Sequence, residues 1–202
     1  MAIQITMQPL SINCYLGDYR SFSIDATETT GAPIGFNWFR DGRQAASGKT
    51  CTANTKTVGS FSYYCRVNSI TGESVNSNTV TLTVNDIVKP VILTQPQDFE
   101  EYIGSDHTVS FTVDEKAAFA YKYEWYKDGA IVATTSDPEY TYRVTSVTAT
   151  AYCVVTASRP SGYGKSTTSN TFTITGKPRE VEIVIEPSSK TVPIGYGHEG
   201  TV

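Results

Sequence analysis

Alternation of apolar and polar residues over short runs is the main pattern in this sequence. It is clearest in residues 36–42 (FNWFRDG), where Phe36 and Trp38 fall on one face of an extended strand and Asn37 and Phe39 on the other. The Asp-Gly pair that follows favours a tight hairpin, because both central residues of a type I′ turn need a positive φ. We therefore predict a central strand that runs into a hairpin.

The same pattern returns in residues 123–129 (YEWYKDG), which places Trp38 and Trp125, the two tryptophans of the chain, 87 residues apart. Other landmarks recur in the same order and at similar spacing, namely Gln8-Pro9 with Gln95-Pro96, Tyr15-Leu16-Gly17 with Tyr102-Ile103-Gly104, Cys65 with Cys153, and residues 77–83 with residues 169–175. A set of landmarks that keeps its order indicates an internal duplication.

Further alternating runs predict the remaining strands of each copy, at residues 3–7, 22–24, 59–67 and 80–84 in the first and at residues 109–113, 121–126, 140–142, 151–156 and 171–175 in the second. Residues 43–56 are polar without alternation, so we expect them to be irregular. No stretch has the 3.6-residue apolar period of a helix. The expected fold class is all-β.

The repeats suggest domain boundaries: residues 1–86 form domain 1, residues 87–177 form domain 2, and residues 178–202 form a linker and the first strand of a truncated third repeat. Lys89-Pro90 matches Lys177-Pro178 at the two joints, and proline limits bending there, so we expect domains arranged end to end. The tail resembles the opening of a repeat, which suggests a piece of a longer protein. The alternative is a tail that completes its fold on a partner.

Charge and composition exclude several function classes. The net charge is −4, and charged residues make up only 18% of the 202 residues. No basic face is therefore expected for nucleic acid or acidic lipid. Neither a signal peptide nor a run long enough to span a membrane is visible, so we expect no membrane insertion.

Catalytic and cofactor chemistry is not indicated. The two histidines and four cysteines lack zinc-site spacing, and His107 has no Gly-x-Ser-x-Gly serine or other nucleophile to pair with. Asp41 and Asp128 are expected to have a structural role in the turns that they form with the following glycines. A calcium site would need further carboxylates, with Asp86 and Glu100-Glu101 as candidates near a joint. We predict no enzyme, no catalytic residue, no cofactor and no metal.

The cysteines, Cys14, Cys51, Cys65 and Cys153, are divided three and one between the repeats, so each repeat cannot have its own disulfide. We expect free thiols, with Cys65 and Cys153 buried as small apolar groups. A Cys14–Cys51 bridge is the alternative for a protein that matures in an oxidising environment.

Each repeat resembles an immunoglobulin sandwich, with a tryptophan on the third strand, a cysteine late in the chain and a Ser-Asn-Thr entry to the last strand. Tyr63 precedes Cys65 by two residues, as in a tyrosine corner, whereas Ala151 holds that position in the second copy. Neither copy has the usual cysteine on its second strand. The 27 residues from Trp38 to Cys65 suggest that extra central strands are absent.

The second repeat is similar to the immunoglobulin-like domains of the highly immunogenic outer capsid (Hoc) proteins of T-even-type bacteriophages. The resemblance rests on residues 123–128, 140–142 and 151–156, Tyr163 and residues 168–171. It implies a decoration protein on the outer capsid surface of a virion, made in the host cytoplasm. The start at Met1 without a secretion signal and the absence of Asn-x-Ser/Thr acceptors agree with that expectation. In that family a separate C-terminal domain, not visible in this sequence, holds the capsid.

The best candidates for contact with a partner are the loop of residues 161–165 (SGYGK) and the outward-facing Phe39 and Tyr126. We expect weak multivalent attachment to bacterial surface glycans or proteins, with the capsid bound through sequence beyond residue 202. The alternatives are a structural spacer or capsid-stabilising coat, and a bacterial or animal cell-adhesion fragment.

Overall fold

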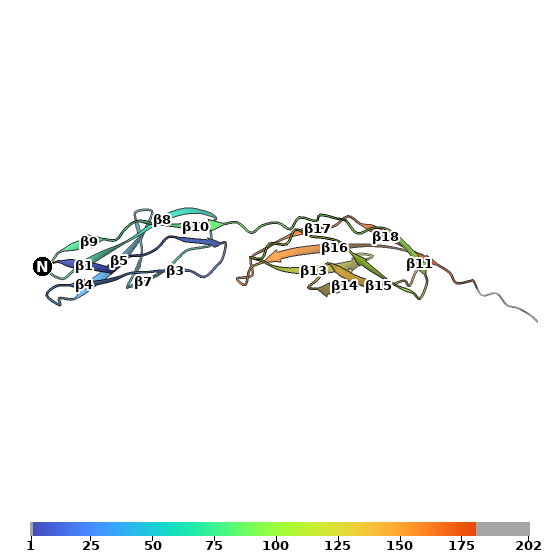
Figure 1. Ribbon diagram of the computed structural model, residues 1–202, viewed down its shortest axis with the longest axis horizontal. Coiled ribbons are helices and arrows are strands. Elements are labelled where there is room, and N and C mark those ends of the chain that lie inside the picture. Colours follow the sequence, from blue (N-terminus) through green and yellow to red (C-terminus); the bar gives the residue numbers. More distant parts are fainter. Residues whose placement is uncertain (1, 181–202) are drawn as a thin grey trace, which may run out of the picture.

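The computed structural model describes residues 2–180, and within them the chain contains strands, turns and loops but no helix. Two β-sandwiches follow one another along the long axis of the molecule, with β1 (Ile3–Met7) in the first and β18 (Phe172–Lys177) in the second (Figure 1). The fold is therefore all-β, in two immunoglobulin-like sandwiches arranged end to end, as predicted. Within residues 2–180, no helix exists that could cross a membrane. Of the predicted linker and partial third repeat at residues 178–202, residues 181–202 lie outside the described range.

The first sandwich is built from ten strands: β1, β2 (Ile12–Tyr15), β3 (Ser21–Ser23), β4 (Asp25–Glu28), β5 (Ile34–Arg40), β6 (Arg43–Ser47), β7 (Thr50–Thr52), β8 (Gly59–Ser69), β9 (Ser74–Asn76) and β10 (Val80–Asn85). Its larger sheet has the order β2-β10-β8-β5-β6, with β9 also paired to β8. The pairs β1–β4 and β3–β7 form the facing layer. Strand β2 runs parallel to β10, while the other pairs are antiparallel.

The second sandwich repeats this plan with eight strands: β11 (Phe99–Tyr102), β12 (Asp106–Ser110), β13 (Ala120–Lys127), β14 (Ala130–Thr135), β15 (Glu139–Arg143), β16 (Thr148–Ser158), β17 (Gly164–Thr168) and β18. Its larger sheet has the order β11-β18-β16-β13-β14, with β17 also on β16. The facing layer contains β12–β15 and an isolated bridge between Ile92 and Val113. The match between the two sheets confirms that the sequence repeat is a structural one.

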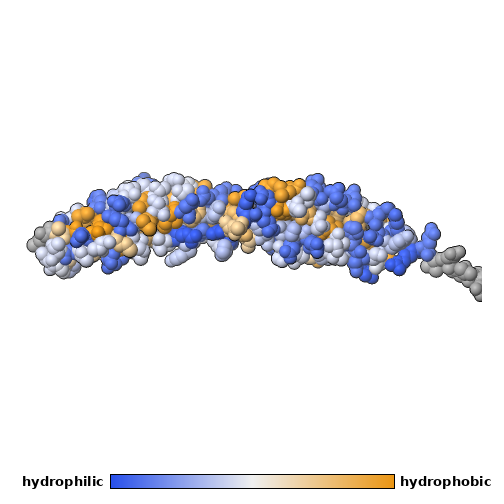
Figure 2. Space-filling view, viewed as in Figure 1, coloured by the Kyte–Doolittle hydropathy of each residue, from blue (hydrophilic) through white to orange (hydrophobic). Residues whose placement is uncertain are grey.

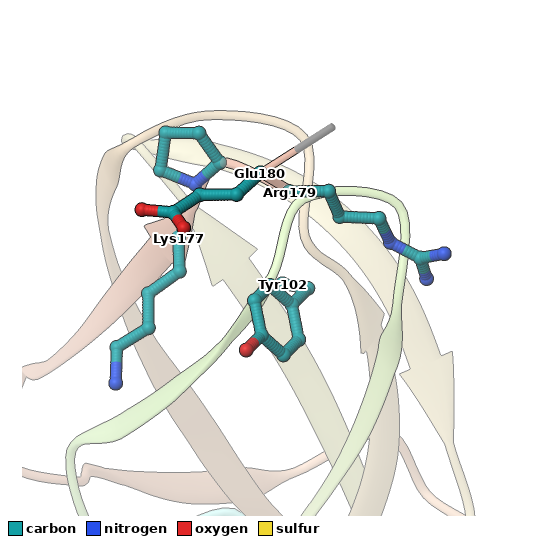
Figure 3. Close-up of a pocket in the computed structure, with 5 residues that line it drawn as sticks. Tyr102, Lys177, Arg179 and Glu180 are labelled. Carbon is teal, nitrogen blue, oxygen red and sulfur yellow. The ribbon is translucent and has the colours of Figure 1, made fainter. Parts of the chain in front are cut away.

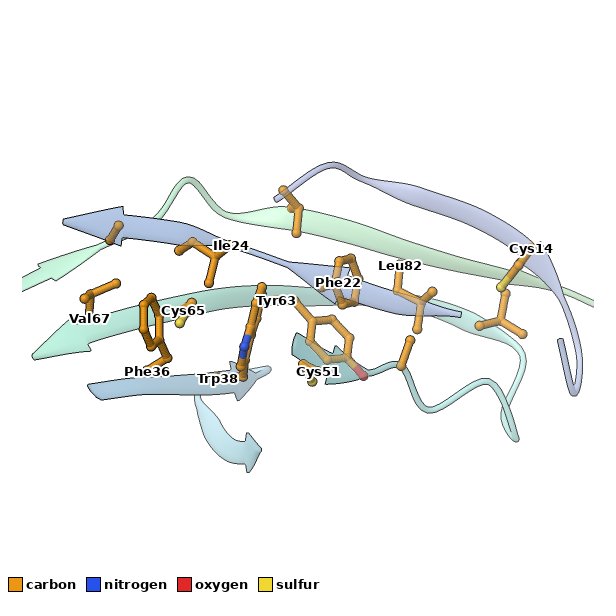
Figure 4. Packing of buried hydrophobic residues seen from close by; sticks show 14 of the residues in the cluster. Cys14, Phe22, Ile24, Phe36, Trp38, Cys51, Tyr63, Cys65, Val67 and Leu82 are labelled. Atoms are coloured by element: carbon orange, nitrogen blue, oxygen red, sulfur yellow. The ribbon is translucent and has the colours of Figure 1, made fainter. Parts of the chain in front are cut away.

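The tryptophans and late cysteines form the centre of each core. Trp38 lies opposite Cys65 on β8, and Trp125 lies opposite Cys153 on β16. All four side chains are fully buried. Figure 4 shows Trp38 between Phe36 and Tyr63, with the Cys65 thiol beside it. The place where an immunoglobulin domain usually has a disulfide is thus filled by packed aromatic rings and a thiol.

All four cysteines are free and buried, so the alternative Cys14–Cys51 bridge is not formed. Burial raises the pKa of the Cys65 thiol to about 11 and that of the Cys153 thiol to about 12. Because thiolate is the reactive form, these two thiols are chemically inert at neutral pH.

The repeated Ser-Asn-Thr motif closes each sandwich through hydrogen bonds. The Ser77 hydroxyl accepts from the Cys65 amide at 2.9 Å, and the Ser169 hydroxyl accepts from the Cys153 amide at the same distance. The next residue of each motif donates its amide to the glutamine of the Gln-Pro motif, Gln8 in the first repeat and Gln95 in the second. Two motifs that lie far apart in sequence are therefore partners in space.

Two predictions about the connecting segments are wrong. Residues 43–56 are not irregular throughout, because β6 pairs with β5 and β7 pairs with β3. The first repeat also has an extra strand, β6, between the strands of Trp38 and Cys65, where the sequence predicts none, and β14 is its counterpart in the second repeat. These strands lie at sheet edges, where nearly every side chain is exposed and alternation in the sequence is lost.

The hairpins after the tryptophan strands have the predicted backbone. Asp41 and Gly42 have φ values of 47° and 80°, and Asp128 and Gly129 repeat them at 48° and 81°. The predicted tyrosine corner is present in the first sandwich, where the Tyr63 hydroxyl accepts from the Asn54 amide at 3.4 Å. In the second sandwich Ala151 cannot form this bond, and the Tyr142 hydroxyl instead donates to the Tyr126 carbonyl.

Candidate functional site

The acidic residues considered as calcium ligands do not converge. The Asp41 and Asp128 carboxylates accept backbone amides from neighbouring strands, from Ser62 of β8 and Thr150 of β16 respectively. Asp86 pairs with Lys165 near the first joint, whereas Glu100 pairs with Lys177 at the far end of the second sandwich. Within residues 2–180, no group of three or more potential metal-ligating side chains exists.

The predicted outward aromatic residues take part in a repeated stack on the larger sheets. Phe39 stacks on Tyr64 with ring centroids 4.9 Å apart, and Tyr126 stacks on Tyr152 at 4.7 Å. All four rings are half-buried. In each pair the two rings cover one face of each other. Stabilisation of the sheet by cross-strand pairing therefore explains these aromatic residues.

The loop of residues 161–165 lies at the junction between the two sandwiches. The Tyr163 ring rests on Gly17 so closely that an added Cβ at Gly17 would lie 2.2 Å from Tyr163 Cδ2. Gly17 also has a positive φ of 80°. One face of the Tyr163 ring, in the loop that the sequence offers as a candidate for contact with a partner, is therefore occupied by the first sandwich.

An ion pair joins the two sandwiches at this junction. Arg159 donates from Nε to Asp18 Oδ1 at 3.1 Å and from Nη2 to Oδ2 at 3.0 Å. The side chain of Asp18 is only 6% exposed, and that of Arg159 is 17% exposed. Arg159 also donates from Nη1 to the Ala118 carbonyl of its own sandwich. This bond holds the guanidinium in the orientation in which its other nitrogens contact Asp18. A planar fork held in this way suits bidentate carboxylate binding.

A small apolar centre lies beside the ion pair. Ile87 of the linker is buried with Phe119 and Ala157 of the second sandwich, and Tyr15 and Leu16 of the first sandwich pack against them. Tyr15 meets Phe119 edge to face, with ring centroids 5.0 Å apart. The Arg159 guanidinium lies over both rings, at 5.1 Å from the first and 5.9 Å from the second. Charge and apolar packing thus act at one place.

The linker itself is also attached. Lys165 pairs with Asp86, and its hydrogen bond lowers the pKa of that carboxyl group. The Thr167 hydroxyl donates to the Pro90 carbonyl at 2.6 Å. The expected match between Lys89-Pro90 and Lys177-Pro178 does not hold in space, because Lys177 is the last residue of β18 and corresponds to Asn85 at the end of β10.

Two hollows flank Tyr19 on the surface of the junction. One of about 430 Å³ is lined by residues 17–19, residues 52–56 and Tyr163. The other, of about 350 Å³, is lined by residues 17–20 and 159–161. Because walls from both sandwiches form them, these hollows depend on the relative placement of the two domains.

Elsewhere the surface gives weaker candidates. Figure 2 shows apolar residues in small separate groups along both sandwiches, mixed with hydrophilic ones. A hollow of about 750 Å³ lies at the far end of the second sandwich, lined by Tyr102 and residues 177–180. Figure 3 shows the side chains of Lys177 and Arg179 extending in different directions there, so the charged groups do not converge on one ligand.

Sequence reasoning missed the junction, although a comparison of the repeats contains a signal for it. Arg159 and Tyr163 bracket a hairpin whose backbone bond, from the Arg159 amide to the Tyr163 carbonyl, is repeated between Ser69 and Glu73 in the first sandwich. Arg159 and Tyr163, which contact the neighbouring sandwich, thus stand where the first repeat has Ser69 and Glu73.

Comparison with known proteins finds no matching protein-family model and no curated protein that matches the sequence. Similar solved structures include the fibronectin(III)-like modules of Clostridium thermocellum CbhA, with 15% identity, a TM-score of 0.39 and coverage of 92% of this chain and 100% of that one. The Ig1-2 module of the Drosophila receptor protein tyrosine phosphatase DLAR has 15% identity, a TM-score of 0.37 and coverage of 88% and 100%. Titin domains Z1Z2 have 18% identity, a TM-score of 0.40 and coverage of 89% and 98%. Because these TM-scores lie below 0.5, no conclusion about this chain is drawn from the similarity.

Proposed function

We propose that this chain is a non-enzymatic display module of a phage virion. Two immunoglobulin-like sandwiches stand on the outer capsid surface and make weak contacts with bacterial surface glycans or proteins. The observation that carries the proposal is the junction, because ion pairing, apolar packing and a bonded linker favour one extended arrangement of the two sandwiches.

An extended arrangement suits adhesion by many weak contacts. A stiff module keeps its outer end away from the surface that carries it, and many copies on one particle raise the effective concentration of each contact. The acidic and aromatic residues of the candidate sites serve folding or the junction, so binding of this kind uses exposed side chains and loops. The resemblance of residues 123–128 and 151–156 to Hoc proteins supports the phage assignment.

Coated particles test the adhesive part. The chain is attached through its C-terminus to beads at increasing copy number, and retention on bacterial cells is compared with that of beads carrying an unrelated tandem immunoglobulin-like protein. We expect retention to rise steeply with copy number for this chain only. Equal retention of both kinds of bead at every copy number would contradict adhesion.

The virion location needs a separate test. An antiserum raised against residues 2–180 should label intact, purified particles of the phage that encodes the chain, as seen by electron microscopy with a gold-labelled second antibody. Labelling on the capsid surface supports the proposal. Antigen found only in the lysate and absent from purified particles overturns the decoration assignment.

The same junction favours a second function, that of a spacer or stabilising coat. In that case any binding is to the capsid. A spacer predicts that coated beads are not retained on cells, while particles that lack the chain lose resistance to heat or osmotic shock. Retention on cells with unchanged particle stability would favour adhesion.

A further inference from the structure

We propose that the two hollows around Tyr19 form one groove at the junction that binds an acidic oligosaccharide. This inference deepens the proposed adhesive function and rests on it for its biological setting, but the site can be tested on the purified chain alone. Clefts between domains are common places for small-ligand sites, because two walls can bury a ligand that neither wall could hold alone.

The groove has a fixed floor. The Gly17 amide donates to the Thr55 carbonyl at 2.9 Å, and the Thr55 hydroxyl donates to the Asp18 carbonyl at 2.7 Å. These bonds tie the loop of residues 52–56 to the turn of residues 17–20. The Tyr163 ring is held against Gly17, so the wall from the second sandwich is set by the same turn. A groove of this kind is preorganised and loses little freedom on binding.

Two tyrosines border the groove with their rings exposed to solvent. Tyr19 is 79% exposed, and Tyr163 is 41% exposed despite its contact with Gly17. Neither hydroxyl has a hydrogen-bond partner within residues 2–180, and neither ring stacks on another aromatic side chain there. An aromatic ring with a polar tip offers an apolar face to the C–H face of a sugar and a hydroxyl to its polar rim.

The charge of the groove is opposite to that of the chain. Three basic side chains, Arg20, Lys56 and Arg159, line the two hollows together with one acidic side chain, Asp18. The Asp18 carboxylate is already bonded to Arg159 and to Arg20. Lys56 has no acidic partner within residues 2–180, and Arg20 is 44% exposed. In a chain of net charge −4, this local excess of positive charge selects an anionic ligand.

The lining favours a sugar over a peptide. Apart from the two tyrosines and the already paired Asp18, the side chains of the lining residues end mainly in hydroxyl, amide, amine or guanidinium groups, and Ala53 and Pro160 are the aliphatic residues among them. A peptide groove normally offers apolar pockets for anchoring side chains. Hydroxyl and amide groups instead match the hydroxyl groups of a saccharide, and Lys56 and Arg20 match its carboxylates.

Titration of the ¹⁵N-labelled chain with a tetramer of galacturonate, followed by amide NMR, tests the site. We expect shift changes confined to residues 17–20, 52–56 and 159–163, with millimolar affinity that falls at least tenfold for the neutral maltotetraose. Tyr19→Ala and Lys56→Ala should each weaken binding at least fivefold. Tyr64→Ala removes an aromatic side chain from the same sandwich but outside the groove, and it should leave binding unchanged.

Three results would overturn the proposal: no shift changes with the acidic tetramer, shift changes that the groove variants do not reduce, or equal binding of a tetraglutamate peptide, which would mean that charge alone is recognised. The test is separable from that of the proposed function. Binding in the groove without retention of coated beads on cells would support the binding site and contradict the adhesive function. Retention that Tyr19→Ala does not reduce would mean that adhesion uses another surface.

Discussion

Removal of the Arg159 side chain should uncouple the two sandwiches. The substitution Arg159→Ala deletes both hydrogen bonds to Asp18 and the cation–π contacts with Tyr15 and Phe119. It leaves a carboxylate that is only 6% exposed, still held by Arg20 and by the Tyr15 amide. Breaking a buried ion pair costs about 3–5 kcal/mol, and because these two partners remain we expect about 2–4 kcal/mol.

Residue-resolved urea unfolding, followed through amide NMR signals of each sandwich, measures this loss. A matched control is Arg143→Ala, which removes an ion pair with Asp106 whose side chains are 62% and 55% exposed. An exposed pair of this kind contributes about 0.2–1 kcal/mol. Asp18→Ala and the double variant complete a cycle, in which the interaction energy should exceed about 1 kcal/mol.

Orientation provides the second measurement. Residual dipolar couplings should give one common alignment for both sandwiches in the unchanged chain and two different alignments in Arg159→Ala. Equal losses of stability in Arg159→Ala and Arg143→Ala, within about 0.5 kcal/mol, would show that the buried pair does not couple the sandwiches. A common alignment of both sandwiches in Arg159→Ala would show the same.

Three further predictions concern the cores and the junction turn. Trp125→Ala should cost about 3–5 kcal/mol and remove the calorimetric transition of the second sandwich while that of the first remains; a native-like second transition would contradict the packing argument. Gly17→Ala should weaken the junction, because its Cβ would overlap the Tyr163 ring and its φ of 80° suits glycine, and a common alignment kept in dipolar couplings would refute this. Since Cys153 has a pKa of about 12 when folded and an ordinary thiol value of 9.0, the unfolded chain releases its proton first and stability should fall between about pH 9 and pH 12. Cys153→Ala should reduce that slope by up to about 1.4 kcal/mol per pH unit in urea titrations, and an unchanged slope would show that the thiol does not contribute.

The parts of the fold that the sequence predicted are those in which one face of a strand is buried. Trp38, Cys65 and their counterparts lie on such strands, so alternation and the internal repeat were sufficient to place them in the core. Strands β6 and β14 were not predicted because edge strands expose both faces, and no periodic signal remains. Their existence depends on backbone pairing with β5 and β13, which side-chain pattern does not encode.

The junction could not be derived from local pattern. Asp18 and Arg159 are 141 residues apart, and each lies in a turn whose polar residues would be ordinary in any loop. The sequence offers Tyr163 as a candidate for contact, but its partner Gly17 stands out only as part of a landmark that both repeats share. Their contact depends on how the linker places the two sandwiches. The linker is held by contacts of Asp86 and Pro90 with the second sandwich, which no local sequence pattern reveals.

The asymmetry of the junction has a consequence for self-assembly. The residue equivalent to Arg159 in the first sandwich is Ser69, and the residue equivalent to Asp18 in the second is Ser105, since both turns repeat the same backbone bonds. A head-to-tail contact between two separate copies would therefore place Ser69 where the arginine is needed and Ser105 where the carboxylate is needed. Heterologous contacts that do not close build open filaments. Within residues 2–180, the Asp18–Arg159 pair is therefore not reproduced in a head-to-tail contact between copies, so the junction does not favour open filaments.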